Sequence, residues 1–119
     1  MYKNSTVIEL IGNDFIKKNK KIIIKNTHMR NGILNIYAPW CTHCVKFAEI
    51  YKEISTLFLN KFNFYACNSE NKKNLKIIDE LKIEYYPTLF IVNKQGNIKK
   101  IKIPINKNKL ICTVYENLI

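Results

Sequence analysis

Two cysteines three positions apart, Cys41 and Cys44, are the residues whose types and spacing point most directly to chemistry. An apolar stretch ends just before Cys41 and a helical pattern begins there, so Cys41 is predicted at a helix N-terminus. Unpaired amide groups at such an end stabilise a thiolate. His43 can add a positive charge or donate a hydrogen bond to the same sulfur. Cys44 lies one turn deeper, so a nucleophile and a shielded resolving thiol could exchange two electrons through a mixed disulfide.

The pattern around this pair predicts alternating strands and helices. Apolar and β-branched residues predict extended segments at 6–11, 20–25, 33–38, 62–67, 88–92 and 98–103. Helical spacing predicts helices near 41–60, 75–81 and 106–118. Asn13 or Asp14 is predicted to cap a short helical turn that contains Phe15 and Ile16. This order implies an α/β fold in which helices flank both faces of a central mixed β-sheet.

The long predicted helix should bury one face. Phe47, Tyr51, Ile54 and Phe58 recur at intervals of four, three and four, which is typical of a helix packed on a core. Asn106 can cap the last helix. The length of 119 residues suits a single domain over 1–119, and no repeat or linker divides it.

Half of a structural zinc site is the alternative interpretation of the cysteine pair. Such a site needs a second pair at suitable spacing, whereas Cys67 and Cys112 each stand alone. We therefore predict no metal and no bound cofactor, and a redox disulfide between Cys41 and Cys44. Cys67 and Cys112 are expected to be buried free thiols.

The stretch Tyr37-Ala38-Pro39-Trp40-Cys41-Thr42-His43-Cys44, with Tyr85-Tyr86-Pro87-Thr88 downstream, resembles the thioredoxin superfamily, and more narrowly a protein disulfide isomerase-type domain. The resemblance covers about 33–100 well and implies the thioredoxin fold. It implies that Cys41 is the attacking nucleophile and Cys44 the resolving thiol, with His43 as a third catalytic residue.

The same resemblance implies a substrate site beside the cysteines. Trp40 and Thr42 are expected to contact substrate from the motif itself. Pro87 should be a cis-proline that faces the disulfide and holds the Tyr86 backbone where an extended substrate segment can pair with it. The expected substrates are cysteine-containing proteins, and the expected redox partner is a sulfhydryl oxidase or a reductase.

The expected activity is thiol–disulfide exchange. His43 is linked by the resemblance to a relatively oxidising couple, which favours an oxidase or isomerase over a reductive thioredoxin. A non-catalytic binding or structural protein that keeps the thioredoxin fold is the third possibility. It is favoured slightly by Asn35, which stands where family members usually carry a buried carboxylate that moves protons at the second cysteine. A lysine that often pairs with that carboxylate aligns with Ala66, so both partners are replaced together, and slower deprotonation of Cys44 is predicted.

Charge and composition exclude two other classes. The net charge is +11, but Arg30 is the one arginine among 20 basic residues, and the lysines are spread along the chain. A dedicated nucleic-acid surface would use arginine for bidentate contacts, so no nucleic-acid partner is expected. The apolar runs are too short to span a bilayer.

The expected localisation follows from the start of the chain and from its composition. No signal peptide is visible in the polar start 1–6. The Ile-, Asn- and Lys-rich composition suits an A/T-rich genome, which favours a cytoplasmic or viral protein over one of the secretory lumen.

Overall fold

A computed structural model describes residues 1–104 and 106–119, and its centre is a five-stranded sheet in the order β1-β5-β4-β6-β7. These strands are β1 (Ile8–Leu10), β4 (Gly32–Tyr37), β5 (Asn63–Asn68), β6 (Thr88–Val92) and β7 (Ile98–Ile101). β1, β5 and β4 run parallel, and β6 and β7 pair antiparallel beside them. The predicted mixed sheet is therefore confirmed. β4 lies at its centre and is buried along its whole length, as its mainly apolar sequence indicates, with Asn35 as the polar exception.

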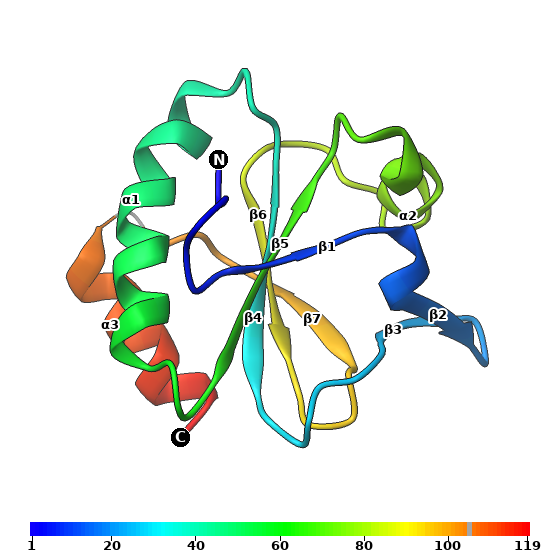
Figure 1. The fold of residues 1–119 in the computed structure, drawn as a ribbon. Coiled ribbons are helices and arrows are strands. Elements are labelled where there is room, and N and C mark those ends of the chain that lie inside the picture. Colours follow the sequence, from blue (N-terminus) through cyan, green and yellow to red (C-terminus); the bar gives the residue numbers. More distant parts are fainter. Residues whose placement is uncertain (105) are drawn as a thin grey trace.

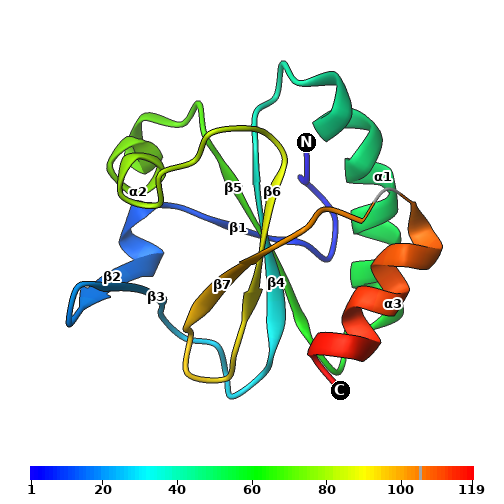
Figure 2. The same ribbon diagram turned by 180° about the vertical axis from the view of Figure 1, so that it is seen from behind.

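Helices cover both faces of the sheet, as predicted (Figure 1). α1 (Thr42–Leu57) and α3 (Lys107–Asn117) lie together on one face. α2 (Leu75–Glu80) lies on the other, beside a small hairpin of β2 (Phe15–Lys18) and β3 (Lys21–Ile24). Figure 2 shows the same three layers from behind.

Two cores result, one on each face of the sheet. The larger core lies under α1 and α3 and holds the predicted stripe of α1 together with Cys41 and Cys44. Tyr51 is fixed at its centre, because its hydroxyl donates to the carbonyl oxygens of Ile33 (2.9 Å) and Tyr65 (2.7 Å) on neighbouring strands. The smaller core lies under α2 and the hairpin and holds Cys67. The sheet thus separates Cys67 from the paired cysteines.

One local prediction is wrong. Phe15 and Ile16 are not in a helical turn but open β2, and the turn is a single 3-10 turn over Gly12–Asp14 that ends before them. Asp14 closes this turn, since its carboxylate accepts the Ile11 amide at 2.8 Å. The chain then pairs with β3, so the isoleucine-rich segment 20–25 is confirmed as a strand. Positive φ angles at Asn19 and Lys20 form the hairpin turn between the two strands.

The other elements agree with the predictions within a few residues. Phe58 follows the last residue of α1, so this helix ends slightly before the predicted residue 60. β7 ends at Ile101 rather than at 103, close to Pro104, which cannot donate to a sheet ladder. The predicted turn over 93–97 is present: Asn93 Oδ1 accepts the amides of Gln95 (3.0 Å) and Asn97 (2.9 Å), and Gly96 takes a φ of 88°. Asn106 caps α3 by accepting the Lys109 amide, as predicted.

Candidate active site

Cys41 caps the N-terminus of α1, as the pattern predicts. Its sulfur accepts a hydrogen bond from the Cys44 amide at 3.4 Å, and its thiol donates to the Tyr86 carbonyl oxygen at 3.5 Å. The side chain is 8% exposed, so a narrow part of its surface meets solvent. No acidic residue stands in the first turn of this helix. The positive end of the helix dipole and the donated amide both favour negative charge on this sulfur.

Cys44 lies one turn further along and is 0% exposed. Burial raises the pKa of its thiol well above the ordinary value, and the neighbouring Cys41 raises it further, while a backbone hydrogen bond with Ala38 acts in the opposite direction. Both cysteines are free thiols in this structure. The two cysteines therefore lie close together in unequal surroundings: Cys41 is buried except for a narrow exposed part, and Cys44 is completely enclosed.

Trp40 and Tyr86 form one wall beside Cys41. Trp40 is 68% exposed, its indole N–H donates to Glu70 Oε1 at 2.6 Å, and its ring meets the Tyr86 ring edge-on at 5.9 Å between centroids. The peptide bond between Tyr86 and Pro87 is cis. Tyr86 therefore makes two contacts at this site: its carbonyl oxygen accepts the Cys41 thiol, and its ring packs against the Trp40 indole. Glu70 was not singled out from the sequence, because nothing in a lone acidic residue after a strand indicates this bond.

A shallow groove of about 390 Å³ runs from the first turn of α1 to the segment after β7. Its walls are mostly apolar, and its lining residues are His43, Lys46, Phe47, Ile50, Tyr86, Pro87, Ile103 and Pro104. His43 is exposed on this wall, and among the described residues it makes no hydrogen bond with either sulfur. Thr42 is also exposed but does not line the groove. The predicted site residues therefore surround Cys41 from two sides, with Trp40 and Thr42 outside the groove.

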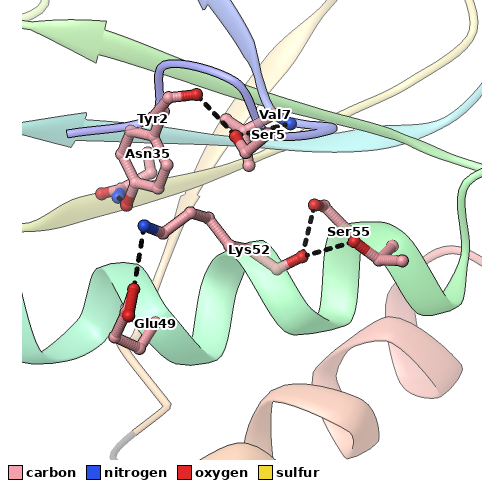
Figure 3. Close-up of polar contacts among 8 residues, drawn as sticks. Tyr2, Ser5, Val7, Asn35, Glu49, Lys52 and Ser55 are labelled. Carbon is pink, nitrogen blue, oxygen red and sulfur yellow. Dashed lines mark hydrogen bonds and ion pairs between the residues drawn. The ribbon is translucent and has the colours of Figure 1, made fainter.

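Asn35 occupies the centre of β4 and is 0% exposed. Its side-chain amide Nδ2 donates to the Tyr2 hydroxyl oxygen at 2.8 Å, whereas its Oδ1 has no hydrogen-bond partner. Ala66 lies beside it in the pairing of β4 with β5. Figure 3 shows the Tyr2 ring next to Asn35, above α1. The sequence does not indicate Tyr2 as a partner of Asn35, because a tyrosine far from the motif carries no signal of its contacts.

The two remaining cysteines differ from each other. The prediction that Cys67 is buried is confirmed, but the prediction for Cys112 is wrong, because it is exposed on α3. The buried face of that helix is formed by Leu110 and Val114 instead. Within residues 1–104 and 106–119, no three His, Cys, Asp or Glu side chains gather as they would around a metal ion. In the same part of the chain, no helix is both long and apolar enough to cross a membrane.

This fold and this cysteine pair define a class: domains in which a two-cysteine motif begins the helix that follows the central strand of a mixed sheet. Residues 13–116 match the family model described as Thioredoxin, and the chain therefore belongs to the thioredoxin family. Among solved structures, the Trx4 domain of ERdj5 superimposes with a TM-score of 0.71 at 16% identity, over 94% of this chain and 95% of that chain. The predicted thioredoxin fold is confirmed.

Curated relatives are of the protein disulfide isomerase type. Protein disulfide isomerase-like 1-2 of Oryza sativa subsp. japonica is 30% identical over 88 residues, which are 74% of this chain and 17% of that protein. The protein disulfide-isomerase of Zea mays is 27% identical over 103 residues, which are 82% of this chain and 19% of that protein. The chain thus spans about a fifth of the length of these relatives. These matches confirm the predicted resemblance to isomerase-type thioredoxin domains.

Proposed function

We propose that this domain is a thiol–disulfide oxidoreductase that exchanges disulfides with protein substrates through Cys41 and Cys44. The observation that carries the proposal is the unequal environment of the two sulfurs. Cys41 is reachable from solvent and receives an amide hydrogen bond, whereas Cys44 is enclosed and its raised pKa keeps it protonated until it is needed. An outer nucleophile and an inner resolving thiol are what a two-step exchange requires.

In the reducing direction, Cys41 attacks one sulfur of a substrate disulfide. A Cys41–substrate bond forms, the substrate S–S bond breaks, and the released substrate thiolate takes up a proton. Cys44 then attacks the Cys41 sulfur, which forms the Cys41–Cys44 disulfide and releases the second substrate thiol. The same steps in reverse oxidise a substrate dithiol, and a sulfhydryl oxidase or a thiol reductase would then restore the domain.

The groove, together with the wall formed by Trp40 and Tyr86, is proposed to hold the substrate chain. An extended segment laid along Pro87 would bring its backbone to Tyr86 and its apolar side chains to Phe47 and Ile50. Trp40 would cover the opposite side of the reacting sulfur, because Glu70 and Tyr86 hold its ring there. His43, exposed on the groove wall, would face the substrate rather than the core.

The proposed direction is oxidation or isomerisation. A stabilised Cys41 thiolate lowers the free energy of the reduced form and makes the disulfide the better oxidant. Equilibration with glutathione measures this directly. We expect a potential nearer the roughly −180 mV of protein disulfide isomerase than the roughly −270 mV of thioredoxin. A value near or below the latter would contradict the oxidising assignment.

Refolding of reduced ribonuclease tests the activity itself. The wild-type domain is expected to accelerate the recovery of ribonuclease activity, and Cys41→Ser is expected to abolish the acceleration. Cys112→Ser is the matched control, since it removes an exposed thiol on α3 and should leave the rate unchanged. A Cys41→Ser domain that performs like the wild type would refute the enzyme and favour the non-catalytic role to which Asn35 points. Cys44→Ser should trap the substrates as mixed disulfides.

A further inference from the structure

The groove beside Cys41 combines an apolar surface with positive charge. Phe47 and Ile50 of α1 give it apolar side chains, and Lys46 and His43 of the same helix line it as well. These four residues share one side of α1, because positions three and four apart on a helix are neighbours. None of the described residues that line the groove is acidic. A substrate segment held there therefore meets an ammonium group and no carboxylate.

The acidic residues of α1 are already paired with other lysines. Glu49 binds the Lys52 ammonium at 2.9 Å, as Figure 3 shows. Glu53 binds the ammonium of Lys107, on α3, at 2.5 Å. Lys46 is exposed and forms no ion pair within residues 1–104 and 106–119. Its charge at the groove is thus not neutralised by a neighbouring side chain.

The positive charge continues beyond the far end of the groove. Ile103 and Pro104 also line a neighbouring hollow of about 440 Å³, in which Lys102 and Lys109 stand against one acidic residue, Glu116. A polypeptide that leaves the groove past these two residues therefore meets a second region of excess positive charge. Such a surface favours acidic partners over basic ones.

Two acidic residues near the reactive cysteine do not line the groove. Glu70 accepts the Trp40 indole N–H at 2.6 Å, and Glu84 is exposed in the segment before Tyr86. Neither is among the residues that a segment in the groove would contact. The charge that such a segment meets beside Cys41 is therefore that of Lys46.

We propose that the groove selects protein substrates that carry an acidic residue close to the reactive cysteine, and that Lys46 determines this selectivity. The proposal rests on the exchange reaction described above and names a class of substrate for it. The substrate packs an apolar side chain against Phe47 and Ile50, and its carboxylate pairs with the Lys46 ammonium. Charge complementarity of this kind discriminates between partners more than it adds affinity.

The helix also indicates how far the carboxylate lies from the cysteine. From His43 to Ile50, α1 rises by about 10 Å, which is the length of about three residues of an extended chain. Lys46 lies near the middle of this stretch. The acidic residue is therefore expected within about three positions of the substrate cysteine.

Peptides joined through one cysteine to a coloured aryl thiol measure the selectivity. The Cys41 thiol loses its proton to solvent, and its sulfur attacks the peptide sulfur. A Cys41–peptide bond forms, the peptide–aryl bond breaks, and the aryl thiolate leaves with the electron pair. Two peptides with leucine beside the cysteine differ only in carrying glutamate or glutamine at the second and third positions on both sides of it. The measured quantity is the ratio of their second-order rate constants for release of the aryl thiolate.

The reduced wild-type domain should react faster with the glutamate peptide. Lys46→Met keeps an apolar stem and removes the charge, and should lower the glutamate-to-glutamine ratio by about threefold, as expected for one exposed ion pair. Lys46→Glu should lower the ratio further, because repulsion replaces attraction. Lys76→Met is the matched control: it removes the same charge from an exposed position of α2, on the other face of the sheet, and should leave the ratio unchanged.

The opposite results would overturn the proposal. An unchanged ratio in Lys46→Met would exclude Lys46, and an equal fall in Lys76→Met would assign the preference to the net charge of the whole domain. Raising the salt from about 0.1 M to about 1 M shortens the screening length from about 10 Å to about 3 Å. The wild-type ratio should then approach that of Lys46→Met, and a ratio independent of salt would contradict the ion pair.

Failure of the exchange reaction itself gives a different result. A wild-type domain that releases no more aryl thiolate than Cys41→Ser, from either peptide, would overturn the exchange activity and the selectivity together. Equal release from both peptides, well above that of Cys41→Ser, would retain the exchange activity and refute the selectivity alone.

Discussion

Cys67 should lower the stability of the fold at alkaline pH. Burial first, and then the negative charges of Glu9 and Asp14, raise the pKa of its thiol from 9.0 to about 12. A thiol whose pKa is higher in the folded state than in the unfolded state contributes to stability. This contribution is fully present below the unfolded-state pKa, and it is lost as the pH rises from that pKa to the folded-state pKa. At pH 10 the unfolded thiol is mostly ionised and the folded one is not, so the loss relative to pH 7 is about 1 kcal/mol.

Urea denaturation of the wild type and of Cys67→Ala, under reducing conditions at pH 7 and pH 10, measures this loss. The substitution leaves a small cavity whose cost of about 1–2 kcal/mol does not vary with pH. The wild type should therefore be the more stable protein at pH 7, and its advantage should shrink by about 1 kcal/mol at pH 10. An advantage of equal size at both pH values would show that the reasoning from burial is wrong.

Three further substitutions test contacts that position the site. Tyr51→Phe removes a fully buried hydroxyl that serves two strand carbonyl oxygens, and should lower the free energy of unfolding by about 1–3 kcal/mol in urea denaturation. Glu70→Ala removes the acceptor of the indole N–H and should loosen the Trp40 ring and raise its fluorescence quenching by iodide, with a stability change below about 1 kcal/mol because the pair is exposed; unchanged quenching would contradict the anchoring role. Gly96→Ala should destabilise the fold by at least about 1 kcal/mol, since φ is 88° and a Cβ would meet the backbone of β3; a neutral effect by thermal denaturation would contradict this.

Much of the secondary structure follows from local patterns in the sequence. The apolar run of β4 and the helical spacing of Phe47, Tyr51 and Ile54 indicate a buried central strand followed by a helix, and the structure has both. The strand order was not available from periodicity, because that pattern specifies which residues are buried but not which strands are neighbours. It came instead from the resemblance carried by the motif around Cys41.

What the sequence did not indicate depends on contacts between distant segments. The capping residue before Phe15 and Ile16 predicts a helical turn there, but pairing with β3 determines their conformation. Cys112 was expected in the core because cysteine is commonly buried, whereas its position on α3 faces away from the buried side chains. The partnership of Tyr2 with Asn35 joins residues 33 positions apart, which no local pattern can reveal.

The separation of the cysteines by the sheet limits which disulfides the chain can form. Cys67 lies in the core beneath α2, and Cys41 and Cys44 lie beneath α1. A Cys44–Cys67 bridge would have to cross the sheet, so β4 and β5 would have to part before Cys67 could pair with either cysteine of α1. The sheet thereby keeps Cys67 apart from the pair whose bond is proposed to form and break, so the third buried thiol stays outside that chemistry for as long as the sheet is intact.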